Sequence, residues 1–268
     1  MLKTITPIDN SVLVERQYAN DKEIENVLQN AKEAQNNWKN TTLNERKQLI
    51  VKFVSSFLSN EEEVVEALCR QIGRPISQCP GEMRGFEERA NYMIENSDRA
   101  LEKVISKSDN EFDNYIRKEP LGTIFVIAPW NYPFNTSVNS IVPSLLAGNT
   151  VILKHSSQTP LCAEQLFNAA IEASLPKNIF QFLHLDHHST SKIISDQRIN
   201  HVLFTGSVSG GIEVKKSIGT RFIGAGLELG GKDPAYVKSD CNLDHAIENL
   251  VDGSYFNSGQ SCCGIERI

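Results

Sequence analysis

Residues 121–154 read LGTIFVIAPWNYPFNTSVNSIVPSLLAGNTVILK, and this stretch decides the fold class. Its apolar, β-branched run at 122–128 predicts a strand, 134–147 predicts a helix, and 149–153 predicts a second strand. A strand, a helix and a strand in this order form a βαβ unit, whose strands lie parallel in a sheet that helices cover. We therefore expect an α/β protein.

The same alternation continues downstream. Strands are predicted at 179–185, 201–204 and 221–229, and helices at 161–174, 189–195 and 209–218. The series predicts an open parallel sheet with flanking helices, of the Rossmann-like kind. Gly230-Gly231 interrupts the series, and a strand at 233–237 and a helix at 243–257, stopping at Gly259, follow. We therefore expect a first domain over 1–230 and the beginning of a second α/β domain over 231–268.

Upstream of the sheet, the first hundred residues predict helices. Apolar residues recur at helical spacing over 21–38, 43–58, 61–71 and 81–103. Asp21 and either Thr42 or Asn44 are the candidate N-caps of the first two helices. The charges of the last helix are interpreted as a solvated face. The polar, alternating stretch 106–118 is typical of an exposed hairpin, which we expect to form an arm over about 104–119.

The composition argues against several classes of protein. The 268 residues carry a formal net charge of −6, so there is no electrostatic footprint for nucleic acid. The longest apolar run, about residues 124–129, is far short of the roughly 20 residues that a membrane span needs. The first ten residues have no apolar core of signal-peptide length. The six cysteines form no CxxC pair, no Cys/His cluster and no regular framework. We therefore expect a cytoplasmic protein with reduced thiols and no metal site.

Unusual residues follow four of the predicted strands. They are Trp130 and Asn131, Lys154, Gly206 and Ser207, and Glu228. In an open parallel sheet, ligands bind in the crevice outside the carboxyl ends of the strands, so four such points would converge on one face. The sequence therefore predicts a cofactor site at that edge of the sheet.

Each of these features also has a purely structural explanation. The segment Gly206-Ser207-Val208-Ser209-Gly210-Gly211 either approaches a phosphate at a helix N-terminus or is a plain strand-to-helix turn, and it lacks the G-x-G-x-x-G fingerprint. Lys154 either contacts a ribose or phosphate or is simply exposed to solvent. His155 beside it is interpreted as structural.

Cys262 and Cys263 are the strongest chemical candidates. A thiolate is a good nucleophile near neutral pH if its pKa is lowered, whereas most cysteines are small buried hydrophobic residues. Glu228 can supply a carboxylate that activates water, and Asn131 an amide N–H for a developing oxyanion. The alternative for Glu228 is a surface carboxylate, although its Leu-Glu-Leu-Gly-Gly setting is rather apolar for that.

With five ordered motifs, the chain resembles the aldehyde dehydrogenases that use NAD or NADP. The motifs are Pro129-Trp130-Asn131-Tyr132-Pro133, the segment 145–154 that ends in Lys154, Phe204-Thr205-Gly206-Ser207 with Gly211, the segment 227–232 around Glu228, and the segment 256–262 that ends in Cys262. The resemblance runs over essentially the whole chain and is densest from Leu121 onward.

The resemblance implies roles for the matching residues. Cys262 would attack the aldehyde carbon, and hydride transfer to the nicotinamide would leave a thioester, which water activated by Glu228 would hydrolyse. The Asn131 side chain and the Cys262 backbone N–H would hold the oxyanion. The remaining residues would bind the cofactor, namely Trp130, Lys154, Ser157, Gly206, Ser207, Gly211 and Leu229. Cys263 would pack in or line the site. The first domain would hold the dinucleotide, and the full-length protein would be a homo-oligomer, a dimer or a tetramer.

Ser157 bears on the choice of cofactor. NAD-preferring members of the family commonly carry a glutamate three residues after the lysine, where it binds both adenosine ribose hydroxyls. Ser157 occupies that position here. A carboxylate there would repel a 2′-phosphate and a serine would not, so we expect NADP to be tolerated, with the preference between the two cofactors left open.

The chain departs from the family pattern in its length. It stops just after the motif cysteine, so we expect most of the catalytic domain, a glutamate-phenylalanine cofactor segment and the last oligomer strand to be missing. One interpretation is part of an enzyme that oxidises a small aliphatic aldehyde or semialdehyde. The other is a catalytically inactive half that binds dinucleotide or pairs with a full-length subunit. A third interpretation is an acylating relative that passes its thioester to coenzyme A. Glu228 argues against it, because such relatives generally lack the water-activating glutamate at this position.

Overall fold

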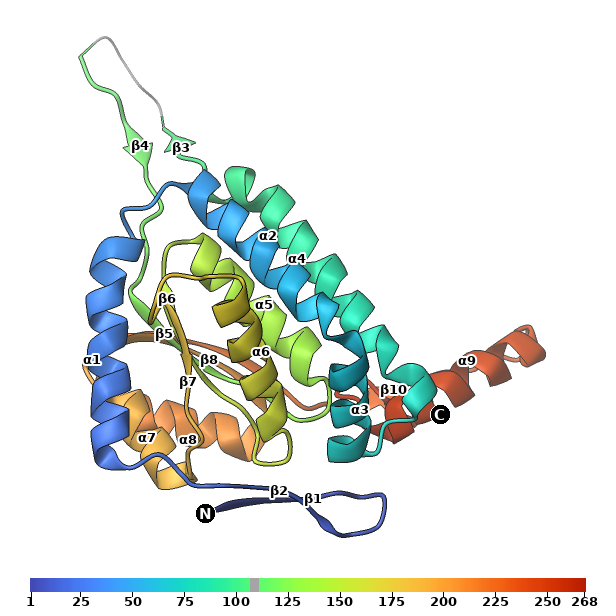
Figure 1. Cartoon of the computed structure of the whole chain (residues 1–268). Coiled ribbons are helices and arrows are strands. Elements are labelled where there is room, and N and C mark those ends of the chain that lie inside the picture. The colour runs from blue at the N-terminus through green and yellow to red at the C-terminus, as the bar shows by residue number, and fades with distance from the viewer. Residues whose placement is uncertain (107–110) are drawn as a thin grey trace.

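An open five-stranded sheet lies at the centre of the computed structural model, which describes residues 1–106 and 111–268 (Figure 1). The strands, in chain order, are β5 (Thr123–Ile127), β6 (Thr150–Lys154), β7 (Phe180–Phe182), β8 (Ile199–Gly206) and β9 (Gly224–Leu229). Their order in the sheet is β7-β6-β5-β8-β9, and every neighbouring pair is parallel. The predicted α/β fold with a Rossmann-like parallel sheet is confirmed. Because the strand order reverses beside β5, ligands are expected where β5 and β8 end.

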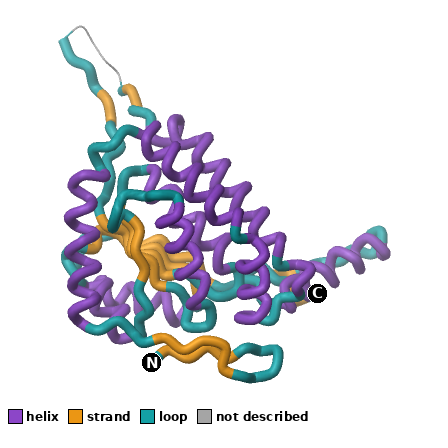
Figure 2. Tube along the Cα trace, in the orientation of Figure 1, coloured by secondary structure: helices purple, strands orange, loops and turns teal. Residues whose placement is uncertain are grey.

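Strand β5 is buried on both faces, and its alternate side chains enter two different cores. Ile124 and Val126 pack with α2 (Leu43–Ser59), α4 (Pro80–Leu101), α5 (Pro133–Leu146) and α6 (Pro160–Glu172). Phe125 and Ile127 pack with α1 (Asp21–Trp38), α7 (His187–Ser195) and α8 (Val208–Ile218). Helices therefore cover both faces of the sheet, as Figure 2 shows, which explains why β5 reads as a continuous apolar run.

The N-terminal helices lie where the helical periodicity predicts them, with α3 at Glu61–Ile72. Of the two candidate caps of α2, Thr42 is the cap, and Asn20 rather than Asp21 caps α1. Asn20 has the extended backbone of a cap, and it forms a capping box with Glu23, whereas Asp21 is already helical. Among the described residues, we find no helix that combines the length and the apolar character needed to cross a membrane.

The prediction of helices throughout the first hundred residues is wrong at the N-terminus. There, β1 (Leu2–Ile5) and β2 (Val12–Arg16) form an antiparallel hairpin. Two short strands offer too few residues for a period of two to stand out in the sequence. Thr4 Oγ1 donates a hydrogen bond to the Ser157 carbonyl at 2.7 Å, so the hairpin supports the loop that follows β6.

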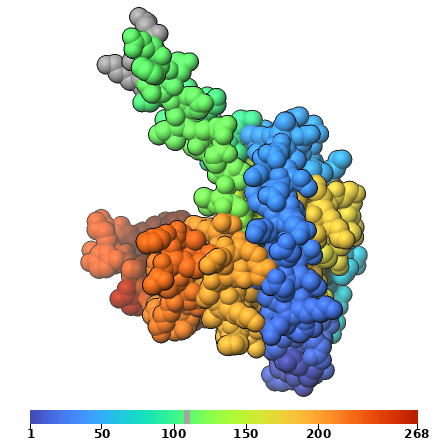
Figure 3. Space-filling view, turned by 90° about the vertical axis from the view of Figure 1, so that its left-hand side faces the viewer, coloured from blue at the N-terminus to red at the C-terminus, as the bar shows by residue number. Residues whose placement is uncertain are grey.

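Two segments project from the body of the molecule (Figure 3). Where an arm is predicted, β3 (Val104–Ile105) and β4 (Tyr115–Ile116) pair antiparallel, and residues 107–110 of that arm lie outside the described residues. At the C-terminal side, β10 (Asp233–Pro234) pairs in parallel with β11 (Ile265–Arg267), apart from the central sheet. Between these strands lies α9 (Leu243–Tyr255), in which no residue is buried.

Glu164 of α6 joins the N-terminal hairpin to the sheet. Its carboxylate accepts hydrogen bonds from Arg16 Nε at 2.7 Å and Arg16 Nη2 at 2.9 Å, and it lies 2.9 Å from His184 Nε2 after β7. Burial by itself raises the pKa of Glu164. The hydrogen bonds from His184 and Arg16, together with the charge of Arg16, outweigh burial and lower the pKa to about 2. The ionised carboxylate thereby fastens β2 to α6.

We expect Glu164→Gln to lower the free energy of unfolding by about 1–2 kcal/mol at neutral pH, an estimate reduced for the solvent exposure of Arg16. Because the folded-state pKa lies below the ordinary value of 4.5, the stabilisation is complete well above pH 4.5 and is lost as the pH falls toward 2. Urea denaturation of both proteins between about pH 3 and pH 7 measures the difference. A difference that widens on acidification would contradict this role.

Candidate active site

The strand-end residues predicted from the sequence lie along one edge of the sheet. They are Trp130 and Asn131 after β5, Lys154 at the end of β6, Gly206 and Ser207 at the end of β8, and Glu228 and Leu229 at the end of β9. Because these four strands are parallel and adjacent, their carboxyl ends share this edge. Trp130 is 41% exposed, and Ser157 is exposed in the loop after β6. The edge is therefore open to a ligand.

Lys154 is buried rather than exposed, so the solvent-exposed alternative is wrong. Its side chain belongs to a strand whose every residue is buried, and burial lowers the pKa of its amine. His155 is also buried, with Nδ1 2.9 Å from Thr159 Oγ1 and Nε2 3.3 Å from Ser137 Oγ. Burial lowers the pKa of His155 to about 3, so the ring is neutral, and its structural interpretation is confirmed.

The glycines of the segment 206–211 allow close packing beneath the turn. A Cβ on Gly206 would lie 2.7 Å from the Phe204 ring, and one on Gly211 would lie 2.8 Å from the Leu229 side chain. Ser207 caps α8, since its Oγ accepts a hydrogen bond from the Gly210 N–H at 3.1 Å. Packing alone accounts for these two glycines, so they fit a plain strand-to-helix turn as well as a phosphate-binding one.

Helix α9 ends at Tyr255, two residues earlier than predicted. In the following turn, η2 (Phe256–Gly259), Asn257 and Ser258 adopt left-handed backbone with φ of 55° and 57°. This conformation breaks the helical path, and asparagine is among the residues that tolerate it best. The turn directs the chain back toward the sheet, where the Cys262 carbonyl oxygen lies 3.2 Å from the position of a Cβ on Gly231. Cys262 is therefore close to the loop that follows Glu228.

The Cys262 thiol is not activated by its surroundings. Partial burial raises its pKa, and the electrostatic interaction and hydrogen bond with the neighbouring Cys263 raise it further. Cys262 is thus a thiol at neutral pH in this structure, whereas nucleophilic attack requires the thiolate. Cys262 and Glu228 are both exposed, so reactants can reach them from solvent.

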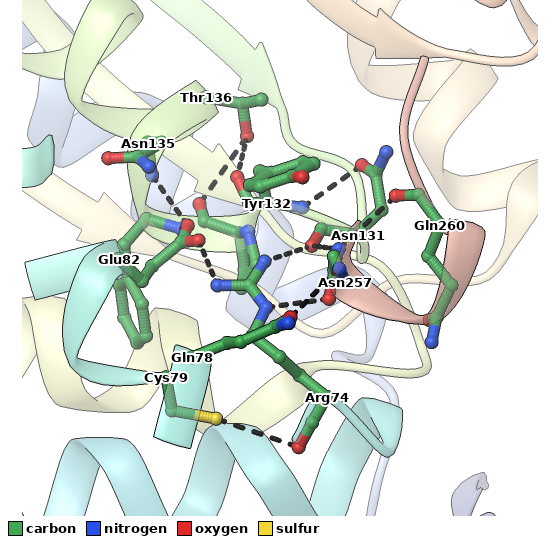
Figure 4. A network of polar contacts seen from close by, with 12 residues as sticks. Arg74, Gln78, Cys79, Glu82, Asn131, Tyr132, Asn135, Thr136, Asn257 and Gln260 are labelled. Atoms are coloured by element: carbon green, nitrogen blue, oxygen red, sulfur yellow. Dashed lines mark hydrogen bonds and ion pairs between the residues drawn. The ribbon is translucent and has the colours of Figure 1, made fainter. Parts of the chain in front are cut away.

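The sequence interpretation missed a buried polar cluster behind Asn131, formed by Arg74, Glu82 and Asn257 (Figure 4). The Arg74 and Glu82 side chains are 2% and 0% exposed, and Arg74 Nη1 lies 2.5 Å from Glu82 Oε2. Arg74 also donates to Asn257 Oδ1 at 2.6 Å and to the Asn131 carbonyl at 2.7 Å. The interpretation of the α4 charges as a solvated face is therefore wrong for Glu82. The available signal was weak, an arginine between a helix-ending glycine and a proline.

The model of the aldehyde dehydrogenase family matches this sequence over residues 1–268. The chain belongs to the aldehyde dehydrogenase family. The resemblance drawn from the five motifs is confirmed by this match and by curated relatives of the same family.

Relatives of this aldehyde dehydrogenase chain include a semialdehyde and a sugar-aldehyde enzyme. Succinate semialdehyde dehydrogenase (NAD(P)+) Sad of Escherichia coli strain K12 is 31% identical over 265 residues, which cover 99% of this chain and 57% of that protein. D-glyceraldehyde dehydrogenase (NADP(+)) of Picrophilus torridus is 28% identical over 268 residues, covering 100% of this chain and 54% of that protein. The chain therefore spans about half the length of the curated relatives it matches.

Solved structures of the family superpose closely on this chain. The structure of succinic semialdehyde dehydrogenase from Streptococcus pyogenes in complex with NADP+ has a TM-score of 0.93 at 26% identity, covering 98% of this chain and 58% of that one. The superposition supports the fold assignment.

We expect Cys263→Ser to lower the pKa of the Cys262 thiol, because the change removes the neighbouring thiol that disfavours ionisation of Cys262. The alkylation rate of Cys262 by iodoacetamide, followed by peptide mass spectrometry across pH, should then rise at a lower pH than in the unmodified protein. Cys241→Ser, which changes another exposed cysteine, is the matched control and should leave the profile unchanged. An unmoved or upward-shifted profile in Cys263→Ser would exclude the coupling.

Proposed function

We propose that the protein oxidises an aldehyde to the carboxylic acid with NAD(P)+, through a thiohemiacetal and a thioester on Cys262. The observation that carries this proposal is the meeting of the Cys262 loop with the carboxyl-end edge of the sheet. Asn257 of that loop donates to the Asn131 carbonyl at 3.0 Å, and the Cys262 backbone approaches Gly231 in the loop after Glu228. These contacts support the proposal that the Cys262 thiol, the Asn131 amide and the Glu228 carboxylate act on one substrate.

The residues at this edge fit a dinucleotide. Lys154 presents a buried amine at the end of β6, and among the described residues no acceptor is paired with it, so its N–H groups are available to a ribose hydroxyl or a phosphate. We propose that the cofactor is held by Trp130, Lys154, Ser157, Gly206, Ser207, Gly211 and Leu229. When bound, NAD(P)+ supplies the hydride acceptor. The family match and the relatives named as NAD(P)+ or NADP+ enzymes support the assignment.

The chain's own residues supply the remaining chemistry. The Cys262 thiolate attacks the carbonyl carbon, and the Asn131 amide with the Cys262 backbone N–H donates hydrogen bonds to the oxygen as it becomes negative. After oxidation, the Glu228 carboxylate takes a proton from the water molecule that hydrolyses the thioester. A short aliphatic aldehyde or a semialdehyde is the proposed substrate, which the semialdehyde dehydrogenases among the relatives support.

Two points of organisation are part of the same proposal. The paired strands β10 and β11, which lie outside the central sheet, support a second domain that begins at about residue 231, after a dinucleotide-binding domain over 1–230. The projecting β3–β4 hairpin exposes Val104, Ile105 and Tyr115, which supports a role for the arm in a homo-oligomer.

A second candidate is a cofactor-binding half without catalytic activity. The exposure of Cys262 and the raised pKa of its thiol favour it, because catalysis requires a thiolate in a sheltered site. Binding of dinucleotide without aldehyde-dependent formation of NAD(P)H would support this candidate and exclude the first.

We expect Cys262→Ala to reduce NAD(P)H formation from succinate semialdehyde or short aliphatic aldehydes by roughly 1,000-fold or more, because the change removes the nucleophile. Glu228→Gln should keep a rapid first-turnover burst of NAD(P)H but slow the steady state by about 100-fold, because the thioester accumulates. Stopped-flow and steady-state kinetics separate the two effects. Cys241→Ser is the control. Activity that survives Cys262→Ala would remove Cys262 from this role.

We expect the protein to accept NADP+, and Ser157→Glu to lower kcat/KM for NADP+ by about 10-fold or more while changing the value for NAD+ much less. The physical reason is repulsion between the new carboxylate and the 2′-phosphate. Steady-state kinetics of both proteins with both cofactors measure the change. A strong preference of the unmodified protein for NAD+ would contradict this prediction.

A further inference from the structure

Arg74 is a buried guanidinium whose three nitrogens bind three separate segments of the chain (Figure 4). Nη1 is paired with Glu82 of α4 at 2.5 Å, Nε donates to Asn257 Oδ1 at 2.6 Å, and Nη2 donates to the Asn131 carbonyl at 2.7 Å. A planar fork of this kind fixes direction as well as distance, which a point charge does not.

Asn257 completes the link between the Cys262 loop and Asn131. Its side chain is fully buried, its Nδ2 donates to the Asn131 carbonyl at 3.0 Å, and its backbone N–H donates to Gln78 Oε1 at 2.9 Å. The Asn131 carbonyl thus accepts hydrogen bonds from both Arg74 and Asn257. These contacts hold the left-handed turn that carries the chain toward Cys262.

Glu82 and Tyr132 fix the other side of the cluster. Glu82 Oε1 accepts hydrogen bonds from the backbone N–H groups of Phe134 at 3.0 Å and Asn135 at 2.9 Å, in the first turn of α5. The Arg74 guanidinium lies over the Tyr132 ring at 4.7 Å, and Ser261 Oγ donates to Tyr132 Oη at 3.2 Å. The segment 131–135 is therefore tied to the residue directly before Cys262.

We propose that Arg74 and Asn257 are positioning residues that clamp the Asn131 backbone to the Cys262 loop. The clamp fixes the separation between the Asn131 amide and the Cys262 thiol. This inference rests on the proposed function, in which both groups act on the same carbonyl group of the substrate. A buried ion pair adds little net stability to a fold. Pairing with Glu82 therefore does not explain why Arg74 also donates hydrogen bonds to Asn257 and to the Asn131 carbonyl. Placement of reacting groups, in contrast, is sensitive to shifts of about 1 Å, which can cost 100-fold in rate.

Arg46 offers a matched control on the opposite edge of the sheet. Its guanidinium is also buried, and it donates to the Leu146 carbonyl at 2.8 Å and to the Thr41 carbonyl at 2.6 Å. These carbonyls lie near the beginning of β6, away from the carboxyl-end edge. Arg46→Met removes a buried guanidinium, as Arg74→Met does, but it frees only neutral acceptors on Leu146 and Thr41. Arg74→Met also leaves the buried Glu82 carboxylate unpaired, so it should lower Tm further than Arg46→Met does.

The test compares Arg74→Met, Asn257→Gly and Arg46→Met in the protein as its gene encodes it. We expect Arg74→Met and Asn257→Gly to lower kcat by roughly 30- to 100-fold with little change in KM for NAD(P)+, while Arg46→Met lowers Tm but leaves kcat within about threefold. Asn257→Gly keeps the left-handed backbone and the Arg74–Glu82 pair, so it preserves the fold if Arg74→Met does not.

A double-mutant cycle with Asn131→Ala separates positioning from general loss of structure. If Arg74 acts through Asn131, Arg74→Met changes kcat by less than about threefold once Asn131 is alanine. Additive losses in the cycle, or losses of kcat that follow Tm equally in Arg74→Met and Arg46→Met, overturn the proposal.

A readout without aldehyde keeps this proposal distinct from the proposed function. Iodoacetamide labelling should give a ratio of Cys262 to Cys263 modification that changes by about threefold or more in Arg74→Met and Asn257→Gly but not in Arg46→Met. If the unmodified protein forms no NAD(P)H with any aldehyde but the ratio changes in this way, the proposed function fails and the clamp stands. An unchanged ratio in both variants overturns the clamp.

Discussion

The burial of β5 on both faces is the constraint on which the rest of the structure depends. Its five residues are all buried, and its backbone pairs with β6 on one side and β8 on the other. A strand in this position needs helices above and below it, so its alternate side chains define two cores. The strand order reverses beside β5, and in open parallel sheets ligands bind outside the carboxyl ends of the strands at such a reversal.

The two edges of the sheet differ in how the hydrogen-bonding needs of their polar groups are met. At the amino-end edge, Gln35 of α1 donates to the Gly148 carbonyl at 2.9 Å and accepts from the Thr150 N–H at 2.7 Å, and Asn149 accepts from the Gly122 N–H at 3.0 Å. Side chains of the protein thus satisfy this edge by themselves. At the carboxyl-end edge, Arg74 and Asn257 satisfy the Asn131 carbonyl after β5, whereas no acceptor among the described residues is paired with the Lys154 amine. This difference is consistent with the proposal that the cofactor binds at the carboxyl-end edge.

The sequence predicts the central sheet well because each strand and helix is indicated by residues that are close together in the chain. Continuous apolar runs, helical periodicity and motif order over 121–229 place strands and helices within a few residues. Prediction from the sequence fails where a conformation depends on residues that are far apart in the chain. Arg74 pairs with Asn257 across 183 positions, and no pattern around Gly73 or Pro75 reveals that partner. The early end of α9 has the same origin, because Asn257 holds its left-handed backbone through contacts with Arg74, Gln78 and Asn131.

Cys262 is held in place by hydrogen bonds rather than by apolar packing. The helix before it has no buried residue, so the hydrophobic effect contributes little to the position of this segment. Its anchors are polar: Asn257 to Arg74, Gln260 Nε2 to the Ile72 carbonyl at 3.1 Å, and Ser261 to Tyr132. Hydrogen bonds are directional, so they can fix the backbone of a loop while its thiol stays exposed. The proposed site therefore depends on directional hydrogen bonds between the Cys262 loop and the segment that begins at Asn131, because few apolar contacts hold that loop.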